Sequence, residues 1–377
     1  MTAAAPRNSE GTIQQLPPVN AGDLLGGRPD VVHSREARLL VGARRILVTG
    51  AGGSIGSELV RQLWQLSPES IHLVDHDESA LHAVQLDLHG HGLLDDETIV
   101  LGDIRQADAM RELMARVRPH IVFHAAAHKH LPLLQRYPSQ GVLSNVIGTA
   151  NVVRAAAEAG VDRFVFVSTD KAARPTSVLG LTKRLGEVIV QAYAGGSMRV
   201  GSVRFGNVLG SRGSFLHSLA WQVGHGRPVT LTSPDVTRYF MTIPQASSLV
   251  IEAATMATAG ETYILDMGQP VRIADLVDRY VTAVQAPGVE VTYTGLREGE
   301  KLHEELLDEK TERRELTADP RIWCVRPRAA VRPDLLRRVE ELRGLVGTVE
   351  DELLVAAMSN LLPDAESEDA SSLEPRA

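Results

Sequence analysis

From Arg45 onward, short runs of apolar residues alternate with longer segments in which apolar positions recur at helical spacing. The short runs predict strands that are buried on both faces, and the longer segments predict amphipathic helices. The expected strands are 46–49, 71–74, 98–101, 121–123, 164–167 and 200–203. The expected helices are 34–41, 58–66, 80–88, 109–117, 142–159 and 183–194. This repeated order of strand and helix predicts an α/β fold with a Rossmann-type, doubly wound parallel sheet.

The alternation becomes less regular after about Gly206, where Gly, Pro and Ser interrupt it. We therefore expect a smaller second domain, partly interleaved with the first. The expected organisation is a disordered N-terminus (1–21), a lead-in segment (22–44) with Pro29 as a stop, a first domain (45–205), a second domain (206–345), and a C-terminal helix with a disordered acidic tail (346–377).

The composition narrows the class of protein. A formal net charge of -8 argues against non-specific nucleic-acid binding, so any positive charge for an anionic ligand must be local. Cys324 is the only cysteine, which excludes a disulfide framework and a cysteine-based metal cluster, and no other metal site is expected. Because no apolar run suggests a signal peptide or a membrane span, we expect a cytoplasmic protein without a membrane partner.

A glycine-rich loop follows the first expected strand. Gly50, Gly53 and Gly56 allow a tight turn, close approach of the backbone to a pyrophosphate, and close packing of the next helix on the strand. That helix begins near Ser54 and Ile55, and its N-terminus offers unpaired N–H groups to phosphate oxygens. The strand before the loop and the helix after it make this a predicted dinucleotide site.

Other residues at the carboxyl ends of the first strands fit the same ligand. Asp75 ends the second expected strand, where a carboxylate binds the adenosine ribose hydroxyls and favours NAD over NADP; the alternative is a helix cap. Asp103, followed by Ile104, could bind the adenine amino group or cap a turn. Ala125 and Ala126 are small enough to let a dinucleotide lie across the sheet edge. The first domain (45–205) is therefore predicted to bind NAD.

The fifth expected strand ends in a hydroxyl, a carboxylate and an amine, those of Thr169, Asp170 and Lys171. Open α/β sheets bind ligands at this edge, so Asp170 and Lys171 are candidates for an acid and a base. Lys183 follows twelve residues after Lys171, inside an expected helix. The alternative is that residues 168–171 only cap the end of the strand and form a surface ion pair. The glycine-rich loop upstream favours the catalytic interpretation.

These motifs together resemble a known family. The chain resembles the NAD(P)-dependent nucleotide-sugar 4,6-dehydratases of the extended short-chain dehydrogenase superfamily, and within them the capsular-polysaccharide branch that acts on UDP-N-acetylglucosamine. The segments that carry the resemblance are 49–56, 124–132, 168–172, 204–213, 237–244 and 295–302. The chain would be a soluble, short-form member of that branch.

The resemblance implies a lyase reaction. Such an enzyme oxidises the C4 hydroxyl of the sugar by hydride transfer to NAD, removes the C5 proton, expels the C6 hydroxyl as water and returns the hydride to C6. Tight retention of NAD would suit this cycle. Asp170 would protonate the departing hydroxyl, Lys171 would take the C5 proton, and Lys183 would hold the nicotinamide ribose. Lys171 can act as a base only if its pKa falls, which burial favours and a neighbouring carboxylate opposes.

One position departs from the superfamily. Its catalytic tyrosine stands four residues before the lysine, and that position is Leu179 here. Members of the branch that retain configuration at C5 commonly have methionine there, so an apolar residue fits that subgroup. The acceptor for the C4 hydroxyl proton stays open between Asp170, a water molecule and a relay through Thr169.

The resemblance also suggests ligands for the UDP diphosphate and for the sugar. The guanidinium groups of Arg204, Arg238 and Arg297 could bind the diphosphate with the Asn207 amide, although Arg204 could instead be a buried structural arginine. Glu300 could contact the uridine ribose or pair with Lys301.

A loop with His128 and Lys129 is expected over the sugar. This places a UDP-sugar mainly in the second domain (206–345).

Three alternatives remain at this point. A nucleotide-sugar 4-epimerase shares the first hydride step but normally keeps the tyrosine. A dehydratase that forms a 5,6-alkene on the same substrate fits the same residues. A non-enzymatic sensor of the cofactor is disfavoured by the presence of Asp170, Lys171 and Lys183. Relatives form dimers or hexamers, so a homo-oligomer is expected.

Overall fold

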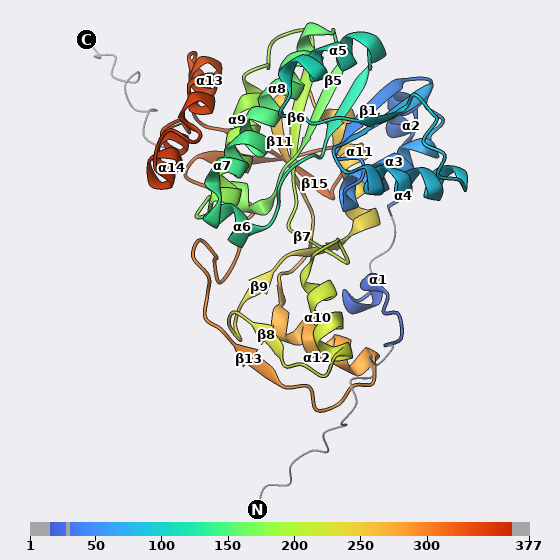
Figure 1. Ribbon diagram of the computed structural model, residues 1–377, viewed down its shortest axis with the longest axis vertical. Coiled ribbons are helices and arrows are strands. Elements are labelled where there is room, and N and C mark those ends of the chain that lie inside the picture. The colour runs from blue at the N-terminus through green and yellow to red at the C-terminus, as the bar shows by residue number, and fades with distance from the viewer. Residues whose placement is uncertain (1–15, 28–30, 364–377) are drawn as a thin grey trace, which may run out of the picture.

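A nine-stranded sheet forms the centre of the computed structural model, which describes residues 16–27 and 31–363 (Figure 1). In spatial order its strands are β14 (Glu312–Leu316), β15 (Ile322–Pro327), β11 (Ala259–Leu265), β6 (Arg199–Arg204), β5 (Arg163–Val167), β4 (Ile121–His124), β1 (Arg45–Thr49), β2 (Ser70–Asp75) and β3 (Ile99–Leu101). The strands from β11 to β3 pair in parallel, and β15 and β14 are antiparallel. The predicted Rossmann-type fold is confirmed, and all six strands predicted from the sequence are present.

The sheet separates two hydrophobic cores, because alternate residues of each strand point to opposite faces. In β5, Phe164 and Phe166 belong to one core and Val165 and Val167 to the other. The first core is covered by α5 (Ala107–Val117), α8 (Gly148–Glu158), α9 (Val178–Gln191), α13 (Leu335–Leu345) and α14 (Asp351–Ser359). The second is covered by α2 (Arg35–Val41), α3 (Ser54–Trp64), α4 (Glu78–His89) and α11 (Ile243–Met256).

A smaller lobe with its own hydrophobic core lies next to the carboxyl edge of this sheet (Figure 1). It contains α1 (Ala21–Leu24), α10 (Phe215–Gly224) and α12 (Ile273–Ala283). Its strands form three short pairs: β7 (Asn207–Leu209) with β10 (Phe240–Thr242), β9 (Thr237–Arg238) with β12 (Val271–Arg272), and β8 (Val229–Leu231) with β13 (Val291–Tyr293). The lobe therefore places β7, β9 and their connections opposite the ends of the parallel strands.

The course of the chain between these bodies differs from the expected domain limits. Within the segment 206–345, α11, β11, β14, β15 and α13 return to the large sheet, so the interleaving is more extensive than expected. Residues 16–21, placed by the sequence in a disordered N-terminus, pack Leu16 and Val19 against the small lobe. Pro29, residues 1–15 and the acidic tail from 364 lie outside the described residues.

The segment 142–159, predicted as one α-helix, begins as a π-helix and continues as an α-helix. Two short helices, α6 (Leu131–Arg136) and α7 (Pro138–Gly141), lead into a π-helix, η1 (Val142–Ile147), which continues as α8. π-Helical turns are frequent at functional sites because they shift side chains out of the α-helical register. Here the turn contains Asn145, whose amide bonds the backbone of His128 (2.8 and 3.0 Å) and the Thr182 hydroxyl (3.1 Å).

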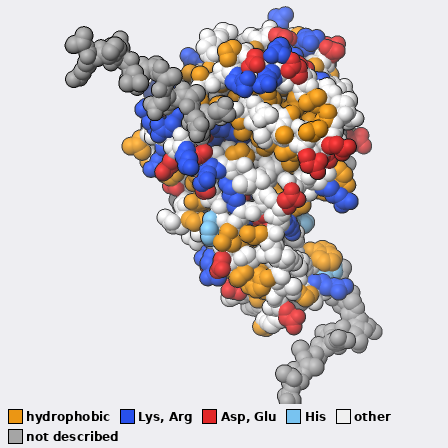
Figure 2. All heavy atoms as spheres, turned by 90° about the vertical axis from the view of Figure 1, so that its left-hand side faces the viewer, with side chains coloured by type: hydrophobic (Ala, Val, Ile, Leu, Met, Phe, Trp, Pro, Cys, Tyr) orange, Lys and Arg blue, Asp and Glu red, His pale blue; other side chains and the backbone are white. Residues whose placement is uncertain are grey.

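The outer face of α13 and α14 carries both signs of charge. Figure 2 shows Lys and Arg side chains interspersed with Asp and Glu on this side of the molecule. Arg154 of α8 pairs with Glu340 of α13 at 2.6 Å, which ties the C-terminal helices to the body of the fold. Within residues 16–27 and 31–363, no helix is both long and apolar enough to cross a bilayer.

His124, at the end of β4, is completely buried beside the glycine-rich loop. Its Nδ1 lies 2.6 Å from Thr49 Oγ1 and its Nε2 lies 2.9 Å from Thr149 Oγ1. Since Thr149 donates its hydroxyl hydrogen to Asn145 O, the network requires His124 to carry its proton on Nε2. Burial, together with the charge of Lys183, lowers the pKa of His124 to about 3.

Acidification should therefore weaken the fold through His124. Between pH 6.5 and pH 3 the unfolded imidazole binds a proton that the folded one does not, so stability falls as the pH falls. From pH 7 to pH 5 this residue alone should lower the free energy of unfolding by about 2 kcal/mol. Urea unfolding of a His124→Asn variant should show a smaller loss over that interval than the wild type or a His217→Asn control. An equal loss in all three proteins would exclude His124 as the source.

Candidate active site

The backbone of the glycine-rich loop after β1 packs too closely on neighbouring backbone to leave room for side chains at Gly50 and Gly56. Gly50 has a φ of +68°, and a Cβ on it would lie 2.6 Å from the backbone nitrogen of Ala126. A Cβ on Gly56 would lie 2.0 Å from Gly50 O. Gly53 is the N-cap of α3 and gives the helix no side-chain cap, so among the described residues the first N–H groups of α3, starting at Ser54 and Ile55, stay available. This arrangement fits a phosphate.

Asp75 lies where the sequence predicts it and supports the same loop. Its Oδ2 accepts a hydrogen bond from Gly52 N at 2.9 Å, and its Oδ1 accepts one from Asp77 N at 3.1 Å. Asp77, and not Asp75, caps α4 by accepting from Ala80 N at 3.0 Å. The helix-cap alternative for Asp75 is therefore wrong. Asp75 Oδ1 also contacts His76 Nδ1 at 3.2 Å, so Oδ2 is the carboxylate oxygen that keeps a further lone pair for a ribose hydroxyl.

The remaining sequence-predicted cofactor residues lie along the same edge. Asp103 is bound by the Arg105 guanidinium (2.6 to 3.0 Å) and backbone, which lowers the pKa of the Asp103 carboxyl. Asp103 therefore caps a turn, which was one of its two predicted roles, and its side chain remains 21% exposed. Ile104 is buried and contacts Gly148 in α8. Ala126 packs its backbone against Gly50, and Ala125 N donates to Thr49 O.

Asp170 and Lys171 lie together in a 3-10 turn, η2 (Asp170–Ala172), directly after β5. Asp170 is completely buried, and its Oδ1 accepts hydrogen bonds from Thr169 Oγ1 at 2.9 Å and Lys171 Nζ at 3.0 Å. In the part of the chain that the structure describes, Asp170 Oδ2 has no hydrogen-bond partner. A buried carboxylate oxygen without a partner is costly, so a ligand or water hydroxyl is expected there.

Lys171 is held by negative groups on two sides. Its Nζ lies 3.0 Å from Asp170 Oδ1, 3.5 Å from Glu304 Oε1 and 3.2 Å from Asn207 Oδ1. Burial opposes the ammonium charge, but Asp170 and Glu304 outweigh it, so the pKa of Lys171 is raised. The pKa decrease that a base requires is therefore not found in this state.

Lys183 of α9 contacts the last residue of β5. Its Nζ donates to Val167 O at 2.8 Å and stands 4.6 Å from the centre of the Phe166 ring. Burial lowers the pKa of Lys183 to about 8, against the influence of Glu187. Leu179, one helical turn before Lys183, is buried in the first core and supplies packing without a polar group.

Of the two roles predicted for Arg204, the structure supports that of a buried structural arginine and not that of a diphosphate ligand. The guanidinium is fully buried and binds the carboxylates of Glu187 (2.6 and 2.7 Å) and Glu312 (2.6 and 2.8 Å), with Arg184 completing a four-residue ion cluster. All its main donors are engaged away from the site. Arg204 therefore stabilises the junction of α9, β6 and β14 and does not bind a diphosphate.

The other candidate diphosphate ligands are Arg238, Arg297 and Asn207. Arg238 donates to Glu300 Oε1 at 2.9 Å and lies 4.0 Å from Glu304 Oε1. Glu300 thus pairs with Arg238, while Lys301 Nζ is buried without a hydrogen-bond partner among the described residues. Arg297 is exposed and its backbone N–H contacts Glu300 Oε2 at 3.3 Å. Asn207 contacts Lys171, so Arg238 and Asn207 adjoin the acid/base pair from the lobe.

The loop with His128 and Lys129 is linked to the glycine-rich loop through Arg212. Lys129 Nζ donates to Ser211 Oγ (3.3 Å) and Arg212 O (2.7 Å), and Arg212 N donates to Ser54 Oγ (3.0 Å) at the start of α3. Burial lowers the pKa of Lys129, and Arg212 adds to the effect. Lys129 is thus directed toward the phosphate end of the site. His128 is exposed beside it.

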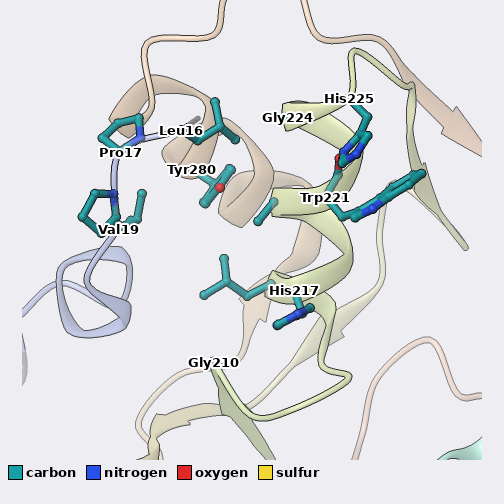
Figure 3. Close-up of a pocket in the computed structure, with 12 residues that line it drawn as sticks. Leu16, Pro17, Val19, Gly210, His217, Trp221, Gly224, His225 and Tyr280 are labelled. Atoms are coloured by element: carbon teal, nitrogen blue, oxygen red, sulfur yellow. The ribbon is translucent and has the colours of Figure 1, made fainter. Parts of the chain in front are cut away.

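A separate groove of about 350 Å³ lies on the small lobe (Figure 3). Leu16, Pro17 and Val19 form one side, and Tyr280 of α12 and Trp221 of α10 form the other. The Trp221 ring stacks on His225 with centroids 4.1 Å apart. None of its lining residues belongs to the Asp170–Lys171 cluster.

Three residues in or next to the site were not singled out from the sequence. Glu304 lies just after the motif that ends at Leu302, and only its neighbours were recognised. Glu187 reaches Ser168 Oγ (2.6 Å), at the end of β5, from four residues beyond Lys183. His124 opens a recognised motif but gave no signal of its network. In each case the spacing along the helix or strand could have suggested which way the side chain points, but not which residue it contacts.

Comparisons with known proteins place the chain in one family. The model of a family described as "Polysaccharide biosynthesis protein" matches residues 46–326. The chain is 41% identical over 341 residues to the probable polysaccharide biosynthesis protein EpsC of Bacillus subtilis, covering 89% of this chain and 56% of that protein. It is 40% identical over 301 residues to the capsular polysaccharide biosynthesis protein CapD of Staphylococcus aureus, covering 78% and 50%. The chain thus spans about half the length of these relatives.

More distant matches include enzymes of two reaction types. A UDP-glucose 4-epimerase of Rickettsia rickettsii is 29% identical over 272 residues, covering 70% of this chain and 77% of that one. Among solved structures, Pen from Bacillus thuringiensis superimposes with a TM-score of 0.69 at 28% identity, covering 82% and 99%. DesIV of Streptomyces venezuelae, a dTDP-glucose 4,6-dehydratase with NAD and TYD bound, gives 0.61 at 22% identity, covering 81% and 99%.

Proposed function

The chain belongs to the polysaccharide biosynthesis protein family, and on that premise we propose that it is a nucleotide-sugar 4,6-dehydratase. The proposed substrate is UDP-N-acetylglucosamine and the proposed product is a UDP-4-keto-6-deoxy-hexosamine. A fold and family of this kind support a nucleotide-sugar enzyme. The choice of reaction rests on the residues of the site.

One observation carries this choice: a buried carboxylate and an amine lie side by side at the sheet edge. Asp170 Oδ1 and Lys171 Nζ are 3.0 Å apart, and Asp170 Oδ2 is buried without a partner among the described residues. A 4-epimerase needs neither a base at C5 nor an acid at C6, so this pair would be idle in it. An acid for the C6 hydroxyl and a base for the C5 proton, lying side by side, fit the elimination of water.

NAD is the proposed cofactor, and the residues present fit it. The close backbone packing at Gly50 and Gly56 is that of a phosphate-binding loop, the N-terminus of α3 lacks a side-chain cap, and Asp75 Oδ2 retains a lone pair for a ribose hydroxyl. Bound NAD would accept a hydride from C4 and return one to C6. Lys183 would hold the nicotinamide ribose, and Lys129 with Arg212 would lie beside the pyrophosphate.

The proton path for the C4 hydroxyl follows from the hydrogen bonds of Thr169. Its hydroxyl donates to Asp170 Oδ1 at 2.9 Å, so it can receive the C4 proton as it passes its own to the carboxylate. Asp170 then holds the proton that the departing C6 hydroxyl requires. The tyrosine absent at Leu179 is replaced in this scheme by Thr169 and Asp170.

The lobe would hold the UDP portion. Arg238 and Arg297 would bind the diphosphate, Asn207 would position the sugar-proximal phosphate, and Glu300 would contact the ribose. His128 would stand at the sugar rim.

Incubation with UDP-N-acetylglucosamine tests the proposal. Mass spectrometry should show the loss of one water from the sugar, and carbon NMR should show a keto carbon. Unchanged mass with a galacto-configured product would instead support an epimerase. Loss of water without a keto carbon would indicate the 5,6-alkene.

A further inference from the structure

We propose that Glu304 is the proton acceptor that converts Lys171 from an ammonium ion into the free amine required at C5. The inference rests on the proposed dehydratase function and concerns the same site. Glu304 acts through Lys171 and is therefore a positioning residue. It was not among the residues selected from the sequence, and its role follows from its place between Lys171 and Arg238.

The position of Glu304 is fixed by the backbone of the lobe. Thr237 N donates to Leu302 O at 3.0 Å, and Thr237 pairs with His303 in a parallel bridge. The Glu304 side chain, 3% exposed, thereby lies between Lys171 of η2 and Arg238 of β9. Its Oε1 lies 3.5 Å from Lys171 Nζ and 4.0 Å from Arg238 Nε.

A count of protons shows why a second carboxylate is needed. In the proposed reaction Asp170 receives the C4 hydroxyl proton through Thr169 and must keep it for the C6 hydroxyl. Asp170 cannot also hold the proton of Lys171. The charged groups that face Lys171 are Asp170 of η2, Arg238 of β9 and Glu304 of the segment after β13. Among these, Glu304 is the remaining proton acceptor.

The step balances without another reactant. The Lys171 ammonium gives one proton to the Glu304 carboxylate, and the free amine takes the C5 proton. The electrons of the C5–H bond form the C5–C6 double bond, the C6–O bond breaks, and Asp170 protonates the leaving hydroxyl to water. As the hydride returns to C6, Lys171 gives C5 one of its three equivalent protons, which exchange with solvent, and the Glu304 proton goes back to Lys171.

Neutralisation of Asp170 in the first step removes the nearest negative charge from Lys171. Since the ammonium is buried, it is then less favoured over the free amine.

A Glu304→Gln variant tests the inference, with Glu305→Gln as its matched control. Glu305 is the next residue, but its exposed side chain pairs with Arg174 at 2.8 Å. At pH 7, Glu304→Gln should lower water loss and deuterium uptake at C5 by about 10²-fold. The rate should recover as the pH rises to 9.5, since solvent base then removes the Lys171 proton. Wild type and Glu305→Gln should show no such rise, and Glu304→Asp should regain part of the rate at pH 7.

A pH-independent loss, or no loss, in Glu304→Gln would overturn the role of Glu304. Retained UDP binding shows that the variant is folded. Titration of Lys171 by NMR of ¹³C-labelled lysine needs no turnover: removal of the Glu304 charge should shift it downward by about one unit or more. An unmoved titration would also overturn the inference. Absence of water loss in the wild type would instead contradict the proposed function.

Discussion

An Asp170→Asn variant is expected to lose the elimination of water by about 10³-fold while it still binds UDP. The amide keeps the shape of the buried side chain, but it can neither accept the proton that Thr169 passes on nor protonate the leaving C6 hydroxyl. Thr169 and Lys171, which bond Asp170 Oδ1 at 2.9 and 3.0 Å, keep a neutral acceptor oxygen. The fold should therefore persist. Product formation measured by mass spectrometry, with UDP affinity by calorimetry, checks both parts.

The matched control for this variant is Asp162→Asn. Asp162 pairs with Arg44 at 3.3 Å with its side chain 62% exposed, at the opposite end of β5. Its replacement should leave the rate unchanged. Activity of Asp170→Asn within about tenfold of the wild type would show that Asp170 is not the general acid.

The second large effect is expected on stability, from Glu187→Gln. Burial opposes the charge of Glu187, but Arg204 and Arg184 outweigh it and lower its pKa. The substitution leaves these two buried guanidinium groups with Glu312 as the only carboxylate of the cluster. Breaking a buried ion pair on one side typically costs about 3–5 kcal/mol, so the free energy of unfolding should fall by that amount. Urea unfolding at pH 7 measures it.

Glu341→Gln provides the comparison on α13. Glu341 also pairs with an arginine, Arg337, but both side chains are exposed. Exposed pairs contribute about 0–1 kcal/mol, so this control should unfold almost as the wild type does. A similar small change for Glu187→Gln would contradict the structural assignment of Arg204 and reopen its role as a diphosphate ligand.

The sequence was sufficient for the elements whose residues are dictated locally. The continuous apolar run of β5 predicts a buried strand, and the glycines at 50, 53 and 56 predict a tight turn before a helix; the structure contains both. Asp170 and Lys171 were found because they directly follow a buried strand. Such inferences need only neighbours along the chain.

The errors concern contacts between distant segments. Arg204 lies in a motif, but its partners are Glu187 of α9, 17 residues before it, and Glu312 of β14, 108 residues after it. The raised pKa of Lys171 depends on Glu304, which only the folded lobe brings within 3.5 Å. Long-range pairing of this kind has no periodicity that a single sequence displays. The return of β11, β14 and β15 to the large sheet was missed for the same reason.

The most direct test of the central claim is the conversion of UDP-N-acetylglucosamine in D₂O, followed by NMR of the product. If Asp170 and Lys171 act on one hexose ring, the product lacks one water and carries a single solvent deuterium at C5, and Lys171→Ala forms no such product. A product that retains the C6 oxygen, or one that carries only hydrogen at C5, would contradict the account.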